Sequence, residues 1–127
     1  MQRQLLWLFL LATALVPALV GAVTETDFEV KTTQNLFNLC TAPPNDLRYR
    51  EALHFCHGYL LGAYHYHVAA TDGEGGKPLV CFPTPPPSRN EAFSMFLAWM
   101  KAHPQYMNER PVETEFRFLI EKWPCPK

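Results

Sequence analysis

Apolar residues recur at helical spacing in four stretches of the chain, and prolines or capping residues separate these stretches. Apolar side chains three and four positions apart share one face of an α-helix, so each stretch predicts a helix with one buried face. The predicted helices cover about residues 26–39, 47–70, 89–102 and 111–123. No long stretch alternates apolar and polar residues as a half-buried strand does. The pattern therefore predicts an all-α fold, a compact bundle of about four helices.

Residues at the ends of these stretches support the boundaries. Ser, Thr and Asp side chains accept hydrogen bonds from the free N–H groups of a first helical turn, and proline suits the first helical position. The expected caps are Thr26 with Glu29 for the first helix, Asp46 for the second, Ser88 with Glu91 for the third, and Pro111 as the first residue of the fourth. His103-Pro104 and Pro124 are expected to end the third and fourth helices.

The second helix is the longest, and two of its glycines share one helix face. The expected buried positions are Leu53, Cys56, Leu60, Ala63 and His67 on the second helix, Phe93, Phe96, Leu97 and Met100 on the third, and Val112, Phe116, Leu119, Ile120 and Trp123 on the fourth. Gly58 and Gly62 lie one turn apart, and glycine inside a helix lowers stability by roughly 1 kcal/mol relative to alanine. We therefore expect another helix to pack closely against them, either within the chain or across a dimer.

The N-terminus has the pattern of a secretory signal peptide. Arg3 precedes a short apolar stretch, and the expected cleavage follows Ala22. The alternative is a membrane anchor, but Pro17 and Gly21 weaken that helix and no basic cluster follows it. We expect residues 1–22 to be a signal peptide and residues 23–127 to be one exported domain without stable membrane insertion. The expected compartment is oxidising, most simply a bacterial periplasm.

Composition narrows the classes of function. The chain has 127 residues, a formal net charge of -1 and 48% hydrophobic residues. These values suit one packed domain and exclude the strongly basic surface that nucleic-acid binding normally needs.

Four cysteines in a short exported chain predict two structural disulfides. The third and fourth predicted helices share a short connection, so we expect them to be antiparallel neighbours. That arrangement brings Cys81, before the third helix, beside Cys125, after the fourth, and leaves Cys40 to pair with Cys56. The chain has no C-x-x-C motif of the kind found in redox, haem or zinc sites.

Four histidines fall on the second predicted helix and raise the question of a metal site: His54, His57, His65 and His67. His65 lies about 12 Å beyond His57 along the helix axis, so three imidazole rings cannot meet at one ion. His54 and His57 alone could do so with a third ligand from elsewhere, and the sequence leaves this open. Cys56 and His57 are adjacent and do not face one another. Without a catalytic motif, we expect no enzymatic activity and no cofactor or metal.

Several short motifs together resemble the Rap/Tai family. They are Leu39-Cys40, the segment C-H-G-Y-L-L-G at residues 56–62, Cys81-Phe82-Pro83, Phe96-Leu97 with His103-Pro104, and the terminal Trp123-Pro124-Cys125-Pro126. This family consists of small periplasmic immunity proteins that protect a cell from type VI secretion amidase effectors. The resemblance implies an all-α, disulfide-containing and often dimeric protein that binds and occludes a peptidoglycan amidase and has no catalysis of its own.

An immunity protein of this kind needs an exposed element that blocks the toxin. The best candidate is the glycine-rich loop at residues 71–78, with Asp72, Glu74 and Lys77 as its charged residues. The competing interpretation of this loop is a solvated linker without a partner. Another class of function, a periplasmic envelope-stress or chaperone-like protein whose histidines charge on acidification, is the alternative. A small metal- or ligand-binding protein that uses His54 and His57 is a third interpretation.

Overall fold

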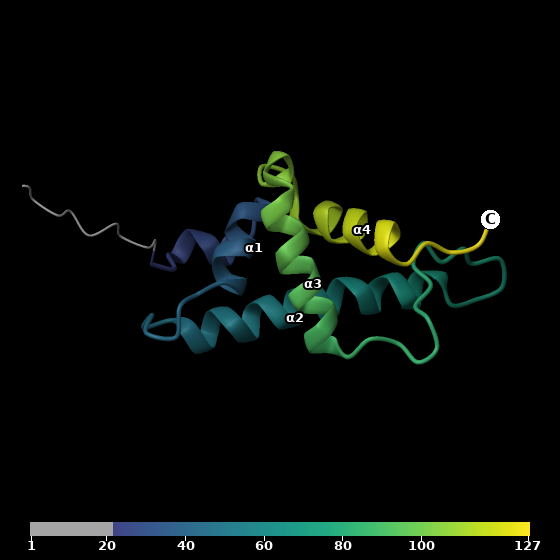
Figure 1. The fold of residues 1–127 in the computed structure, drawn as a ribbon, viewed down its shortest axis with the longest axis horizontal. Helices are drawn as coiled ribbons and strands as arrows, with labels where there is room; N and C mark the ends of the chain where they lie inside the picture. Colours follow the sequence, from purple (N-terminus) through teal and green to yellow (C-terminus); the bar gives the residue numbers. More distant parts are fainter. Residues whose placement is uncertain (1–21) are drawn as a thin grey trace, which may run out of the picture.

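The computed structural model describes residues 22–127, which fold into a domain of four α-helices and two 3-10 helices (Figure 1). In chain order these are η1 (Glu25–Glu29), α1 (Thr33–Cys40), α2 (Tyr49–Thr71), α3 (Arg89–Ala102), η2 (Pro104–Tyr106) and α4 (Pro111–Lys122). The predicted all-α fold is confirmed. Within residues 22–127 the only β-type pairing is one isolated antiparallel bridge between Val80 and Pro124.

The expected signal peptide, residues 1–22, lies outside the described residues apart from Ala22. Among the helices that are described, none combines the length and the apolar character that crossing a membrane would need.

The first predicted helix, residues 26–39, is wrong as a single element. Two helices replace it, and Val30 separates them with a left-handed backbone (φ 47°). The expected cap of Thr26 with Glu29 is also wrong. Each of the two helices has its own capping box, formed by Thr24 with Asp27 for η1 and by Thr32 with Asn35 for α1, and neither box was predicted.

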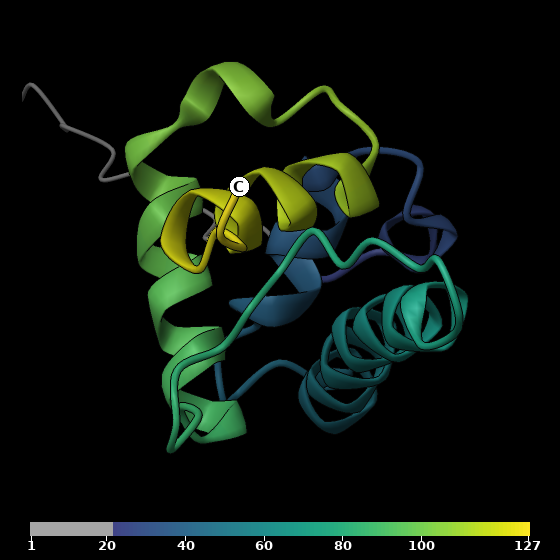
Figure 2. The ribbon, with the colours of Figure 1, turned by 90° about the vertical axis from the view of Figure 1, so that its right-hand side faces the viewer.

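Helix α1 lies in the middle of the domain and contacts η1, α2, α3 and α4 (Figure 2). Leu36 and Leu39 on α1 are completely buried. The backbone N–H groups of Thr33 and Gln34 donate to the carbonyls of Glu109 (2.8 Å) and Met107 (2.9 Å) in the connection between α3 and α4. These bonds satisfy N–H groups that a free helix end would leave without partners.

A buried pair of hydroxyl groups joins α1 to α4. The Thr33 and Thr114 hydroxyl oxygens lie 2.7 Å apart, and both side chains are fully buried. The Thr33 hydroxyl donates to the Glu109 carbonyl at 3.0 Å, so its oxygen accepts a hydrogen bond from the Thr114 hydroxyl. The pair therefore leaves neither buried hydroxyl without a partner, which is the condition for burying such groups without a large penalty.

Helix α2 begins two residues later than predicted, and Asp46 is not its N-cap. Arg48 occupies that position without a side-chain cap bond. Asp46 instead accepts from the Arg48 backbone N–H (2.8 Å) and from the Val23 backbone N–H (2.9 Å). The predicted seam of α2 is confirmed in outline: Cys56, Leu60 and His67 are buried.

Helix α3 begins at the predicted cap, because the Ser88 hydroxyl accepts from the Glu91 N–H and the Glu91 carboxylate accepts from the Ser88 N–H. However, α3 lies across α4 instead of running antiparallel beside it (Figures 1 and 2). The physical reason is the proline-rich segment at residues 83–87, which bends at Thr84 and Pro85 and separates Cys81 from the start of α3. Cys81 can therefore reach the end of α4 while the start of α3 lies elsewhere.

The buried face of α4 differs from the predicted one. Val112 and Ile120 were expected to be buried but are 39% and 38% exposed. The buried positions are Pro111, Thr114, Glu115, Phe118 and Leu119, with Trp123 just beyond the helix end. Periodicity favoured the apolar residues, whereas the hydroxyl pair with α1 turns Thr114, and with it Glu115, towards the interior.

Candidate functional site

Both predicted disulfides are confirmed. Cys40 pairs with Cys56 and Cys81 pairs with Cys125, with Cα–Cα separations of 5.2 and 4.8 Å. The first bridge joins the end of α1 to α2. The second joins the segment before α3 to the segment after α4, although α3 and α4 are not the antiparallel neighbours from which this pairing was deduced.

The loop that follows α2 is the most exposed segment that connects two helices. Every residue from 72 to 79, including Asp72, Glu74 and Lys77, is exposed, and we call this segment the exposed loop. It turns at Gly75, whose φ of +81° favours glycine, and the Gly76 N–H donates to the Gly73 carbonyl at 2.9 Å. The loop projects at the end of the molecule that carries the C-terminus (Figure 1).

The helical frame holds the exposed loop at both ends. At its start, the Thr71 hydroxyl donates to the His67 carbonyl at 2.9 Å, which closes the last turn of α2. At its end, the Leu79 N–H donates to Nε2 of the buried His67 ring at 3.2 Å. Beyond it, the Cys81 N–H donates to the Trp123 carbonyl at 2.9 Å, beside the second disulfide. The glycine-rich exposed loop is therefore held by hydrogen bonds at Thr71 and at Leu79.

The two glycines of α2 lie on an exposed face. A Cβ atom added at Gly58 or at Gly62 would meet no atom within 4 Å, so no described part of the chain packs against them. The expected close packing therefore does not occur within residues 22–127. Phe55 (36% exposed) and Tyr66 (76% exposed), each about one turn from a glycine, extend the same helix face.

The structure separates the histidines of α2. His54 and His65 are exposed, whereas the buried His67 is bonded to the exposed loop. His57 packs on Phe93 with ring centroids 4.3 Å apart. Burial, helped by the charges of Arg89 and His54, lowers the pKa of His57. Within the described residues, no group of three or more His, Cys, Asp or Glu side chains is arranged to hold a metal ion.

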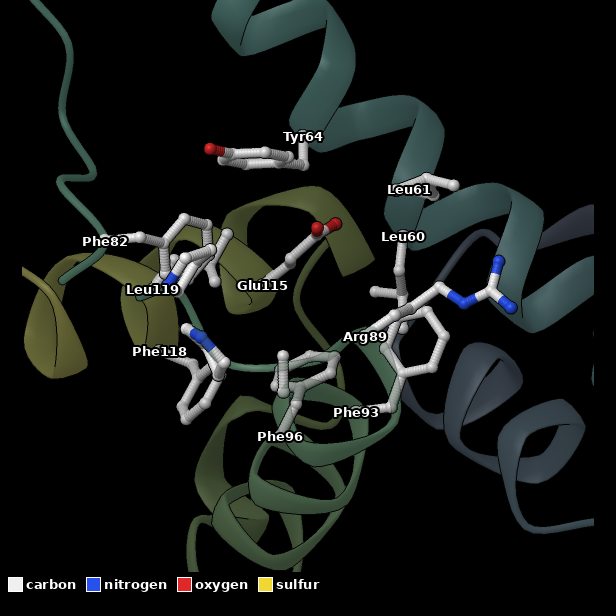
Figure 3. Close-up of a pocket in the computed structure, with 13 residues that line it drawn as sticks. Leu60, Leu61, Tyr64, Phe82, Arg89, Phe93, Phe96, Glu115, Phe118 and Leu119 are labelled. Carbon is white, nitrogen blue, oxygen red and sulfur yellow. The ribbon is translucent and has the colours of Figure 1, made fainter. Parts of the chain in front are cut away.

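A half-open cavity of about 320 Å³ lies between α2, α3, α4 and the segment that carries Phe82, Pro86 and Pro87 (Figure 3). Leucines and aromatic rings line most of it, and the aromatic rings are those of Tyr64, Phe82, Phe93, Phe96 and Phe118. Arg89, at the first position of α3, lies at the rim and is exposed. The cavity has the size and apolar character typical of small-molecule sites.

One acidic residue interrupts this apolar lining. Glu115 on α4 is 4% exposed, and its Oε2 atom has no hydrogen-bond partner among the described residues. Figure 3 shows its carboxyl group pointing from α4 towards α2, in the space between Tyr64 and Leu60. Burial raises the pKa of Glu115 to about 9, so the carboxyl group is neutral at pH 7 and can both donate and accept a hydrogen bond.

Sequence reasoning found the cysteines and the exposed loop but missed Glu115. An acidic residue between apolar neighbours on an amphipathic helix normally indicates the solvent face. The only available signal was the spacing of Glu115 from Pro111 and Leu119, which places the three on one helix face.

Comparison with known proteins identifies one family. The family model described as Rap1a immunity proteins matches residues 32–125, a range that contains all four α-helices and both disulfides. No curated protein and no solved structure matches the chain.

Replacing Glu115 by glutamine should remove one pH dependence of folding stability. The folded pKa of about 9 lies above the ordinary 4.5, so the stability from this group is complete below about pH 4.5 and is lost as the pH rises towards 9. Each pH unit in this window corresponds to at most about 1.4 kcal/mol. Relative to wild type, Glu115→Gln should therefore gain roughly 2–4 kcal/mol between pH 5 and pH 8.

Urea unfolding at the two pH values measures this difference. Glu74→Gln in the exposed loop is the matched control, because it makes the same substitution at an exposed position that does not line the cavity. An equal stability difference between Glu115→Gln and wild type at both pH values would contradict a buried neutral carboxyl group.

Proposed function

We propose that this chain, which belongs to the Rap1a immunity protein family, binds a type VI secretion peptidoglycan amidase and inhibits it sterically. Membership of an immunity family indicates a non-enzymatic protein that acts by binding a secreted effector. The exposed loop is the observation that carries the finer proposal, because it is the projecting element that the frame holds at both ends. An enzyme cleft is a concave site, and a projecting loop has the complementary shape.

The anchoring of the exposed loop supports such a role. A segment that is ordered only on binding loses conformational entropy at that moment, which weakens the complex. His67 and the Cys81–Cys125 disulfide fix the far end of the loop in advance and reduce this loss. Asp72, Glu74 and Lys77 then supply charges of both signs for hydrogen bonds in the cleft of the amidase.

The proposed site of action is the periplasm, after removal of residues 1–22. Val23 supports cleavage after Ala22, because its side chain is 7% exposed and its backbone nitrogen donates to Asp46 Oδ2 at 2.9 Å. Cleavage would convert this nitrogen into an ammonium group beside a carboxylate. Hydrogen bonds from the backbones of Arg48 and Val23 already lower the pKa of Asp46, so the carboxylate is charged and ready to pair.

We also propose that the exposed glycine face of α2 mediates a homodimer. Gly58 and Gly62 allow close approach of a second backbone, and Phe55 and Tyr66 provide apolar and aromatic surface beside them. A two-fold symmetric contact would place the same face on both subunits. It would also explain why α2 retains two glycines that lower its helical stability.

Neutralising the loop charges should weaken inhibition of the amidase at least about tenfold without unfolding the protein. The variant is D72N/E74Q/K77Q, and inhibition is measured as hydrolysis of purified peptidoglycan by a purified type VI amidase that the wild-type chain binds. The matched control, E29Q/K31Q/E51Q, removes the same number of exposed charges at other positions and should inhibit normally. Equal inhibition by both variants would exclude the loop charges, and failure of the wild-type chain to bind would overturn the proposed function.

The proposed ion pair predicts that Asp46→Asn is more destabilising in a chain that begins at Val23 than in the unprocessed chain. Only the former carries a charged ammonium group next to Asp46, whereas the latter presents a neutral amide. Thermal unfolding at pH 6.5 measures the difference, with wild type and Asp46→Asn each tested as the processed and as the unprocessed chain. N-terminal sequencing of exported protein identifies the cleavage site. Equal loss of stability in the two backgrounds would contradict the pairing.

Alanine at Gly58 and Gly62 should separate helix stability from association. Each substitution should stabilise the monomer by about 0.5–1 kcal/mol, because alanine favours the helix and the added Cβ atom meets nothing within the chain. The same methyl groups should weaken the dimer, which sedimentation equilibrium measures. Gly73→Ala in the exposed loop is the control, because its Cβ atom also has open space and lies away from this face. A monomeric wild-type chain would overturn the proposed dimer.

A further inference from the structure

The cavity beside Glu115 is an unexplained feature of a small domain. An open cavity leaves apolar side chains in contact with water, which forfeits the stabilisation that their burial would give. Here the proline-rich segment and the Cys81–Cys125 disulfide hold the outer wall in place, so the wall cannot easily collapse inwards. A cavity of about 320 Å³ has room for a molecule on the order of ten non-hydrogen atoms.

Glu115 shows that the cavity is suited to more than apolar contact. A buried polar atom without a hydrogen-bond partner is rare in native proteins, because it forfeits its solvation without compensation. Oε2 of Glu115 is such an atom, and its carboxyl group points into the cavity (Figure 3). Glu115 is one of the residues that line the cavity, so a hydrogen-bonding group inside the cavity would lie next to its carboxyl group.

We propose that this cavity binds a small uncharged molecule with an apolar, preferably aromatic, body and one hydroxyl or amide group that hydrogen-bonds to the Glu115 carboxyl group. The aromatic rings of Tyr64, Phe82, Phe93 and Phe118 would pack against the body. The polar group would complete the hydrogen bonding of Glu115. This site is independent of the proposed immunity function, since it uses neither the exposed loop nor the glycine face of α2.

The charges around the cavity favour an uncharged molecule over either kind of ion. An amine would require Glu115 to ionise in an apolar site, and the positive charge of Arg89 at the rim opposes its entry. A carboxylate could pair with Arg89 at the rim, where water screens the interaction. Its apolar tail would then occupy the cavity and leave Oε2 of Glu115 without a partner.

Three probes with one carbon skeleton test this assignment: 2-phenylethanol, 2-phenylethylamine and phenylacetate. Titration calorimetry of the disulfide-bonded chain at pH 7 gives the affinities, and methyl NMR shifts of Leu60, Leu61 and Leu119 report whether a probe enters the cavity. We expect 2-phenylethanol to bind there at least about tenfold more tightly than either charged probe. Tighter binding of the amine or the acid, or no shift of these methyl groups with any probe, would overturn the proposal.

Two substitutions of Glu115 identify the hydrogen bond. Glu115→Gln keeps a donor and an acceptor and should bind 2-phenylethanol within about threefold of wild type. Glu115→Leu has neither and should lose about tenfold for 2-phenylethanol, while it binds ethylbenzene at least as tightly as wild type. Equal affinity of the wild type and Glu115→Leu for 2-phenylethanol would overturn the role of Glu115.

A third variant addresses the cavity itself and leaves Glu115 intact. Ala92 on α3 lines the cavity and is only partly buried, so Ala92→Phe can fill the space from the α3 side. Binding of 2-phenylethanol should be lost in this variant, with helix content by circular dichroism unchanged. Ala98→Phe, at an exposed position of the same helix, is the matched control and should bind normally. Unchanged binding by a folded Ala92→Phe chain would overturn the location of the site.

Discussion

The docking of helix α1 is the constraint on which the rest of the domain depends. A helix of eight residues is unstable in isolation, so its ends must be held by other parts of the chain. The connection before α4 accepts hydrogen bonds from its first turn, and the bond between Cys40 and Cys56 joins its last residue to α2. The two halves of the chain therefore meet at α1. Because α1 provides much of the link between α2 and α4, a cavity can remain between those two helices.

The sequence predicted the parts of the fold that local chemistry determines. Ser88 with Glu91 and Pro111 begin their helices as expected, because a cap or a proline acts within a single turn. The break at Val30 was not predicted, because the apolar positions of residues 26–39 suggested one helix and the two capping boxes at Thr24 and Thr32 were not recognised. The crossing of α3 over α4 also depends on the path that the proline-rich segment takes in space, and hydrophobic periodicity does not predict that path.

The features of the candidate site likewise divide into those that the sequence predicts and those that it does not. The exposed loop was predictable, because glycines and charges between a helix and a cysteine exclude regular structure. The cysteine pairing was also predictable, although from a helix arrangement that the structure does not have. Glu115 was not predictable, because its burial depends on Thr114 meeting Thr33, a contact between residues far apart in the sequence. The helix face chosen by that contact overrides the face that hydrophobicity alone would choose.

The two disulfides close separate stretches of the chain, one from Cys40 to Cys56 and the other from Cys81 to Cys125. Neither stretch encloses the other, and the exposed loop lies in the segment between them. An insertion or deletion in that loop leaves the size of both covalent rings unchanged. Lineages that face different toxins could thus alter the length and charge of the loop while the oxidised frame is inherited intact. The arrangement separates the part of the chain free to diversify from the part under constraint.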